Sequence, residues 1–336
     1  MKQLIIILSI FIGFNVSAQT TAIPDANFEQ NLIILGFDSG APDGLVLTSN
    51  IDTITNLVVN NSSISDLTGI EDFISLKYLS CYNNQLAVLD ISQNTNLIDL
   101  YCNSNQLTTL NVSQNISLEQ LYCFSNQLTN LDVNQNTALK FLLCSNNQLT
   151  TLNVSHNNSL QELSCFSNQL VNLNVSQNIS LVKLQCSHNQ LSCLNVKNGN
   201  NTNFTGSQPF LASSNPNLIC IEVDDVSYSV ANWTDIDAQA SFDTSCANPC
   251  VVGVDGISIS NLSIYPNPTN GIISIDLGEV LTDISVTLTN SLGQVVLSEN
   301  YASTSFINID INAPKGIYFL QLETNGEVIT KKIIKE

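Results

Sequence analysis

The chain contains no arginine and only nine lysines against 28 acidic residues, so its formal net charge is −19. Proteins that bind nucleic acid need a basic surface that neutralises phosphates. The charge balance therefore argues against nucleic acid as a partner, and equally against charge-driven adhesion to anionic lipid. Charged residues make up only 11% of the chain, whereas hydrophobic residues make up 43%. This apolar content predicts a folded chain, because disordered chains lack it.

Side chains suited to catalysis are also scarce. The chain has two histidines, His156 and His188, and both occupy variable positions of the surrounding sequence pattern. There is no glycine-rich phosphate loop, no EF-hand loop and no pair of carboxylates of the glycosidase type. We therefore predict that the protein is not an enzyme, and that it has no catalytic residues, no metal site and no cofactor.

Long hydrophobic runs are absent except at the N-terminus. There, Lys2 is followed by a mostly apolar run over residues 4–14 and by small residues ending at Ala18. A membrane-spanning helix needs about 20 apolar residues, so the pattern predicts a cleavable signal peptide over residues 1–18 and no transmembrane segment. No cysteine lies near the cleavage site, which argues against a lipid anchor. We expect the mature chain to leave the cytoplasm.

What the sequence does contain is a repeat. Six cysteines recur every 21 residues, at positions 81, 102, 123, 144, 165 and 186. Aligning the chain on them gives the pattern Leu-x-x-Leu-x-Cys-x-x-Asn-Gln-Leu-x-x-Leu-Asx-Val-x-x-Asn-x-x, with Ile91 in place of Val in the first copy. This pattern resembles the leucine-rich repeat, with cysteine at the third leucine position. The resemblance predicts six leucine-rich repeats over residues 76–194.

The short repeat predicts a solenoid. Each unit is too small to bury its own apolar face, so several units must stack. The Leu-x-Cys step has the period of a strand whose leucine and cysteine both face inward. Neighbouring units then form a parallel sheet on the concave face, with strands about 4.8 Å apart, while the convex side is irregular. We expect an internal ladder of asparagines that satisfies the turn backbone: Asn84, Asn105, Asn126, Asn147, Asn168 and Asn189.

The repeated cysteines are open to several interpretations: a metal ladder, a disulfide ladder, redox chemistry or plain packing. Identical positions on stacked strands give parallel side chains, which do not converge on a metal ion. Disulfides need Cβ atoms about 3.8 Å apart and angled towards each other. We therefore predict that the six periodic cysteines act as small buried hydrophobes.

The N-terminal end of the solenoid needs a cap, because stacked repeats expose their core at both ends. Residues 19–75 are expected to supply a capping helix that starts at Asp25, followed by one 22-residue repeat with Ser62 at the ladder position. The apolar stripe of the helix comprises Phe28, Leu32 and Leu35. The 22-residue repeat resembles that of internalins, the bacterial leucine-rich adhesins.

The repeat decays after Cys186, and residues 195–256 are predicted to form an irregular last turn and a C-terminal cap that contains Trp233. The non-periodic cysteines lie at positions 193, 220, 246 and 250. In an exported protein a disulfide is expected here. Cys220 and Cys246 are the preferred pair because both belong to the segment that ends the solenoid, although the sequence alone leaves the pairing open.

Residues 257–336 have a different composition, with short alternating strands that predict a small all-β sandwich. The motifs "YPNPTNG", "LGQVV", "PKGIYFLQL" and "KKIIK" resemble the type A C-terminal sorting domain of the type IX secretion system of Bacteroidota. The resemblance covers residues 261–336 and implies that this secretion machinery is a partner. It also implies a protein that is secreted, extracellular or attached to the outer-membrane surface. The alternative is an ordinary carbohydrate-binding or fibronectin-like sandwich.

The strand positions that flank each inward Leu-x-Cys step must face outward on the concave sheet. Eight of the eighteen such positions are aromatic or leucine, although aromatics form only 7% of the chain. These predicted ligand-binding residues are Tyr78, Tyr82, Tyr101, Tyr122, Phe124, Phe141, Leu143 and Phe166. Strand propensity is one explanation, and a binding patch is the other.

The predicted fold is thus a leucine-rich-repeat solenoid with few helices, followed by a small all-β domain. Two functions remain open. In the first, the protein binds a protein or glycan partner through its concave face, in adhesion or recognition. In the second, it is a structural surface or matrix protein that self-associates and has no dedicated ligand.

Overall fold

The computed structural model describes residues 19–336 except 206, 248–249, 251–261, 291–292 and 325–326. The predicted signal peptide and the proposed boundary at residue 257 lie outside the described residues. The chain divides into two compact units, Met1–Cys250 and Val251–Glu336, and each is described by itself. No helix in the described part of the chain is long and apolar enough to cross a membrane.

The N-terminal cap combines one hairpin and one helix. Strand β1 (Thr20–Ala22) pairs antiparallel with β2 (Leu45–Leu47), and helix α1 (Ala26–Ile34) lies between them in sequence. Asp25 starts the helix, because its carboxylate accepts hydrogen bonds from two backbone N–H groups of the first turn. Phe28 and Leu32 are buried, as the predicted stripe requires, but Leu35 is 42% exposed because the helix has already ended.

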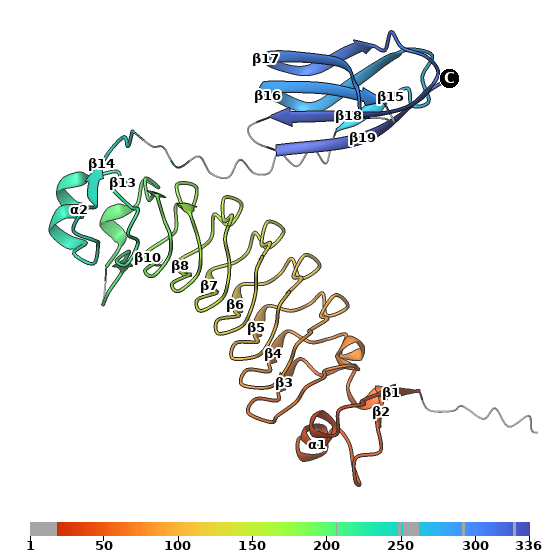
Figure 1. Cartoon of the computed structure of the whole chain (residues 1–336). Coiled ribbons are helices and arrows are strands. Elements are labelled where there is room, and N and C mark those ends of the chain that lie inside the picture. Colours follow the sequence, from red (N-terminus) through yellow and green to blue (C-terminus); the bar gives the residue numbers. More distant parts are fainter. Residues whose placement is uncertain (1–18, 206, 248–249, 251–261, 291–292, 325–326) are drawn as a thin grey trace, which may run out of the picture. The chain divides into compact units, whose positions relative to one another are not determined.

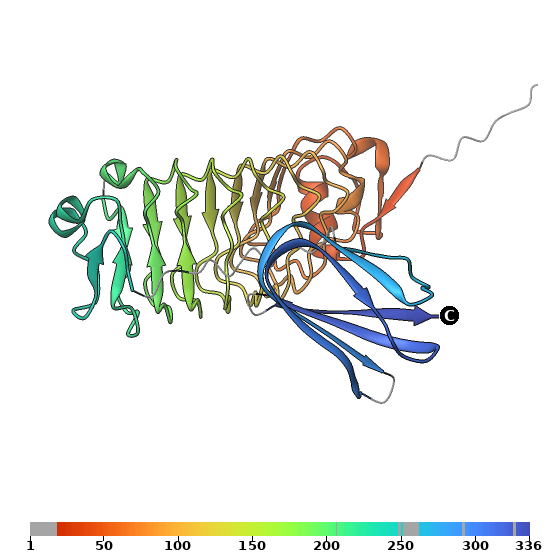
Figure 2. The ribbon, with the colours of Figure 1, turned by 90° about the horizontal axis from the view of Figure 1, so that it is seen from above.

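An eight-stranded parallel sheet forms one side of the solenoid, in the order β12-β10-β8-β7-β6-β5-β4-β3. The turns stack in a curve with this sheet along the inner side, and the strands follow one another in regular steps (Figures 1 and 2). Each three-residue strand has its central leucine in the core, and the two-residue strand β12 buries Phe210. The bounds are β3 Asn56–Val58, β4 Tyr78–Ser80, β5 Asp99–Tyr101, β6 Gln120–Tyr122, β7 Phe141–Leu143, β8 Glu162–Ser164, β10 Lys183–Gln185 and β12 Phe210–Leu211.

The interior of the solenoid repeats from turn to turn. In each of the six periodic turns the two strand-side leucines, the cysteine and the later Leu and Val are buried, and one continuous core runs from the cap helix to Trp233. All six periodic cysteines are buried and unpaired. Stacking therefore supplies the burial that a single short unit cannot achieve.

The opposite side differs from the predicted irregular surface at the C-terminal end of the stack. There a second parallel sheet forms, in the order β14-β13-β11-β9. Its strands are β9 Asn172–Asn174, β11 Cys193–Asn195, β13 Cys220–Glu222 and β14 Ser241–Asp243. The earlier turns carry the same Leu-Asx step without a strand in the described residues; short 3-10 helices occur at Thr48–Asn50, Ile70–Asp72 and Asn201–Asn203.

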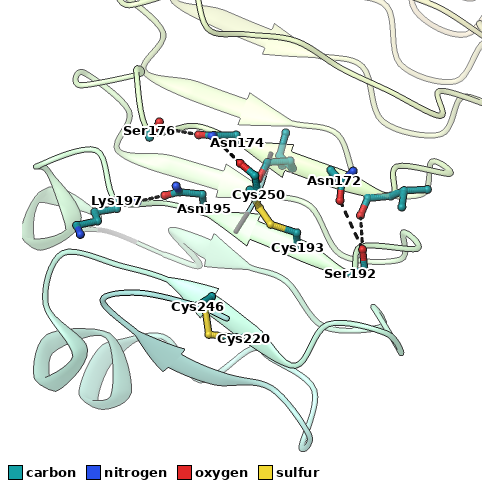
Figure 3. Close-up of a disulfide and its surroundings, with 12 residues drawn as sticks. Asn172, Asn174, Ser176, Ser192, Cys193, Asn195, Lys197, Cys220, Cys246 and Cys250 are labelled. Carbon is teal, nitrogen blue, oxygen red and sulfur yellow. Dashed lines mark hydrogen bonds between the residues drawn. A yellow bond between two sulfur atoms is a disulfide. The ribbon is translucent and has the colours of Figure 1, made fainter. Parts of the chain in front are cut away.

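The C-terminal cap closes this end with helix α2 (Val226–Asn232) and a cluster of aromatic rings. Trp233 stacks on Phe210 at 4.3 Å between ring centroids and also contacts Phe204 and Phe242. Two disulfides hold the last turns together, Cys220–Cys246 and Cys193–Cys250 (Figure 3). The four non-periodic cysteines thus behave differently from the six periodic ones.

The C-terminal unit is a five-stranded antiparallel sheet. Its strands are β15 Ser263–Tyr265, β16 Ile272–Asn290, β17 Val295–Asp310, β18 Gly316–Thr324 and β19 Glu327–Lys335. The long strand β16 pairs with β15, β17 and β18. The described strands therefore belong to one hydrogen-bonded sheet, a half-barrel, and not to the two separate sheets of the predicted sandwich. Thr269 donates its backbone N–H to Ile334 at 2.8 Å, which ties the "YPNPTNG" loop to β19.

Candidate binding face of the solenoid

The register of the inner sheet arranges its outward side chains in three rows. The first strand residues align as Tyr78, Asp99, Gln120, Phe141, Glu162 and Lys183. The third strand residues align as Ser80, Tyr101, Tyr122, Leu143, Ser164 and Gln185. A third row follows two positions later in each turn and comprises Tyr82, Asn103, Phe124, Ser145, Phe166 and Ser187. The predicted ligand-binding residues all fall in these rows.

Aromatic rings on adjacent strands touch one another. The ring centroids of Tyr78 and Tyr101 are 5.3 Å apart, and those of Tyr101 and Tyr122 are 4.5 Å apart in an edge-to-face arrangement. The Tyr101 hydroxyl also donates a hydrogen bond to Gln120 Oε1 at 2.9 Å. These contacts fix the three tyrosines as one cluster across β4, β5 and β6.

The outward side chains of the inner sheet pack against one another and are only partly exposed to solvent. Of the eight predicted ligand-binding residues, only Tyr82 is exposed, at 36%, and the other seven are half-buried. The small polar members of the rows, including Ser80, Ser145 and Ser164, are buried between their larger neighbours. Because the sheet is curved inward, the outward side chains crowd one another and present a packed surface.

The charged groups of the face fall into two kinds. Lys140 pairs with Glu119 at 2.7 Å and Lys183 pairs with Glu162 at 2.8 Å. Asp99 takes part in no ion pair among the described residues. Burial and the neighbouring Glu119 raise the pKa of its carboxyl above the ordinary value.

Burial and nearby acidic groups also raise the pKa values of two tyrosines of the cluster. Desolvation, followed by the effects of Tyr122 and Asp99, raises the pKa of Tyr101 to about 12. The pKa of Tyr122 is also raised, first by desolvation and then by Glu162. The hydroxyls therefore stay protonated at neutral pH, and the aromatic cluster lies in a negative local potential.

The predicted asparagines form a hydrogen-bonded ladder beneath this face, which we call the first asparagine ladder. From Asn105 to Asn189 the side-chain oxygen accepts the N–H of a leucine in the preceding turn, as Asn105 does from Leu86 at 3.0 Å. In these copies the amide nitrogen donates to the carbonyls of two cysteines, here Cys81 and Cys102. The first copy, Asn84, instead accepts from Ser62 and Ile64 and donates to Val59 and Cys81. The ladder continues at Asn215, which accepts from Leu191. Sequence reasoning missed this member because no periodic cysteine precedes it.

A second asparagine ladder was not anticipated as a structural feature. It comprises Asn94, Asn115, Asn136, Asn157 and Asn178, all fully buried. Their amide nitrogens donate to backbone carbonyls of the preceding turn. The signal was present in the repeat pattern as an asparagine three positions after the valine. Among the described residues, no three His, Cys, Asp or Glu side chains gather into a possible metal site.

Comparison with known proteins identifies the C-terminal unit. Residues 263–336 match the family model described as the secretion system C-terminal sorting domain. Within the chain, 72 residues are 40% identical to Internalin J of Listeria monocytogenes serotype 4b (strain F2365). This match covers 21% of the chain and only 8% of the length of Internalin J.

Solved internalin structures are also similar to this chain. The functional domain of InlJ from Listeria monocytogenes, which includes a cysteine ladder, aligns over 95% of this chain and 99% of its own, with 21% identity and a TM-score of 0.37. The internalin inlF from Listeria monocytogenes strain 4b F2365 aligns over 66% of this chain and 68% of its own, with 19% identity and a TM-score of 0.47.

The sorting domain implies export followed by attachment to the surface or by secretion. The tandem repeats, the stacked solenoid and the Internalin J match agree with one another on the N-terminal unit. The chain thus combines a leucine-rich-repeat solenoid that is similar to Internalin J with a type IX secretion C-terminal sorting domain.

Proposed function

We propose that the protein, once exported through the type IX machinery, binds a protein or glycan partner through the inner face of its solenoid. The observation that carries this proposal is the continuous aromatic cluster of Tyr78, Tyr101 and Tyr122 on adjacent strands. Phe141 and Leu143 extend it onto β7, where Leu143 is directly beside Tyr122, and Phe124 follows β6 by two residues.

Core packing does not account for these residues, because their side chains leave the interior. Aromatic side chains dominate the energetics of protein interfaces, and central anchors typically cost at least about 2 kcal/mol when truncated. The rings are already fixed by contact with their neighbours, so little conformational entropy is lost when a partner binds. A preorganised aromatic surface of this kind suits recognition.

The test is a partner-capture experiment with the purified protein and the double variant Tyr122→Ala/Phe124→Ala. We expect affinity for a captured partner to fall at least about thirtyfold, the equivalent of about 2 kcal/mol. Loss of the ring contact with Tyr101 should lower the unfolding free energy by only about 0.5–1.5 kcal/mol, so the variant stays folded.

Two matched variants control this experiment. Ile116→Ala truncates an apolar side chain that is 61% exposed outside the inner sheet, and it should leave capture unchanged. Leu121→Ala opens a cavity beneath Tyr122 and should cost about 2–5 kcal/mol of stability. Full affinity of the double aromatic variant for the partner would place binding elsewhere. Concentration-dependent oligomers that survive the double substitution, measured by light scattering, would instead favour the self-associating structural protein.

A further inference from the structure

We propose that the inner face holds a site for a lysine or arginine side chain of a protein partner, built by Asp99, Tyr78 and Tyr101. This inference rests on the proposed function and deepens it, because it states the chemistry of the partner. It follows from the geometry of the tyrosine cluster and from one carboxylate that makes no ion pair among the described residues.

The three residues lie together because of the sheet register. Tyr78 is directly beside Asp99 on the neighbouring strand, and Tyr101 follows Asp99 by two residues on the same face of β5. The two rings are 5.3 Å apart and tilted by 41°. A carboxylate and two aromatic rings from adjacent strands thus form one compact group on the face.

Asp99 differs from the other carboxylates of the face. Glu119 and Glu162 are paired with lysines, whereas Asp99 has no ion pair in the described part of the chain. Its Oδ1 atom is buried and has no hydrogen-bond partner there. The charged groups that act on its carboxyl are Glu119, which opposes ionisation, and Lys140, which favours it; a side-chain hydrogen bond with Gln120 also favours the ionised form. Gln120 and Lys140 compensate the negative charge only in part, because burial and Glu119 outweigh them.

A cationic side chain satisfies both parts of this arrangement. An ammonium or guanidinium group is attracted to the face of an aromatic ring within about 6 Å of its centroid, and it would also neutralise Asp99. A neutral sugar stacks best on a flat aromatic platform, whereas the tilted rings at Tyr78–Tyr101 and the edge-to-face pair at Tyr101–Tyr122 offer no such platform. The chain's net charge of −19 also attracts basic partners over longer distances.

The test compares the peptide Gly-Gly-Lys-Gly-Gly with the same peptide carrying Nε-acetyllysine, titrated against the full chain by ligand-observed NMR. We expect the charged peptide to bind at least fivefold more tightly than the acetylated one. Asp99→Asn removes the charge with almost no change of shape, and it should abolish this preference.

A control variant separates the local site from general attraction to an acidic protein. Asp90→Asn removes the same charge on the opposite side of the repeat, where Asp90 accepts a hydrogen bond from the Ser92 N–H at 2.9 Å. The next turn makes the same bond with asparagine, from Ser113 to Asn111 at 3.0 Å, so the repeat accommodates asparagine at this position. It should change the preference for the charged peptide by less than twofold.

Thermal unfolding supplies a second readout. Since the pKa of Asp99 is raised in the folded chain, its ionised form opposes folding at neutral pH, and Asp99→Asn should not lower the unfolding midpoint. A lower midpoint would indicate a structural role for Asp99 and would overturn the inference.

Two outcomes of the peptide titration would also overturn it. The first is an unchanged preference of Asp99→Asn for the charged peptide, and the second is an equal loss of this preference in Asp90→Asn. If Tyr122→Ala/Phe124→Ala loses its captured partner while Asp99→Asn keeps it, the proposed function stands and this inference fails.

Discussion

The two asparagine ladders differ in how completely each side chain is used. In the first ladder, Asn126 accepts the Leu107 N–H at 3.0 Å and donates to the carbonyls of Cys102 and Cys123 at 3.1 Å. In the second ladder, Asn136 donates to the carbonyls of Val112 and Asn115. Its side-chain oxygen is buried without a hydrogen-bond partner in the described residues.

The contribution of each ladder to stability depends on which backbone groups would lose their hydrogen-bond partner if the asparagine were removed. The carbonyl of Cys102 also accepts from Asn105, and that of Cys123 also accepts from Asn147, so both keep a partner if Asn126 is removed. Only the buried Leu107 N–H depends on Asn126 alone. In the second ladder, the carbonyls of Val112 and Asn115 already accept backbone N–H groups of their own turn. No backbone group in that region depends on Asn136 alone, although this residue is the more deeply buried one.

Of the substitutions in the two ladders, Asn126→Ala is expected to have the largest effect. The substitution leaves the Leu107 N–H buried and unpaired, which costs about 1–3 kcal/mol. Urea unfolding of the purified protein measures this loss as a lower midpoint with an unchanged slope. An unfolding free energy equal to that of the parent protein would show that water or a backbone shift replaces the side-chain oxygen.

A smaller effect is expected for Asn136→Ala. The substitution orphans no backbone group and removes a buried oxygen that lacks a partner, so the remaining cost is the small cavity that the amide leaves. We expect less than about 1 kcal/mol, below the cost of Asn126→Ala. The same urea experiment ranks the two variants. If Asn136→Ala is the more destabilising, burial and not hydrogen-bond dependence governs these ladders.

Sequence periodicity predicted what recurs in each turn and missed what depends on contacts between turns. The Leu-x-Cys step identified the inner sheet, and the repeated asparagine after the cysteine marked the first ladder. The second ladder carries an equally regular asparagine, but its role depends on which carbonyls lie one turn away. Asn215 escaped notice because its turn has lost the cysteine, although its backbone still follows the repeat.

On the inner face, too, the sequence predicted the positions of side chains but not the contacts between turns. Alternation predicted which residues point outward, from Tyr78 to Phe166, since strand geometry alone determines it. It could not predict that Tyr101 contacts both neighbouring tyrosines, or that Asp99 makes no ion pair in the described part of the chain while Glu119 and Glu162 do. These properties arise from side chains 21 residues apart, which meet only when the turns stack in register.

The backbone carbonyls of the periodic cysteines accept hydrogen bonds in the first ladder, whereas their thiols take no part in it. Burial raises the pKa of the Cys102 thiol to about 12 and that of Cys123 well above its ordinary value. Thiolate, the reactive form, is therefore absent at pH 8 in the folded chain, and the side chains are inaccessible to solvent.

We expect iodoacetamide at pH 8 to modify none of the six thiols in native protein and all six after denaturation, as counted by mass spectrometry. The four remaining cysteines are held in disulfides and serve as an internal control, since they react only after reduction.

The pH dependence of stability follows from the raised pKa values of the thiols. Between about pH 9 and the pKa of the folded state, the thiols of the unfolded chain lose their protons while those of the folded chain keep them. The unfolding free energy therefore falls as the pH rises. Labelling should therefore begin only where alkaline unfolding begins. Modification of native protein at pH 8, or a disulfide between two periodic cysteines, would contradict the assignment of these thiols as inert packing groups.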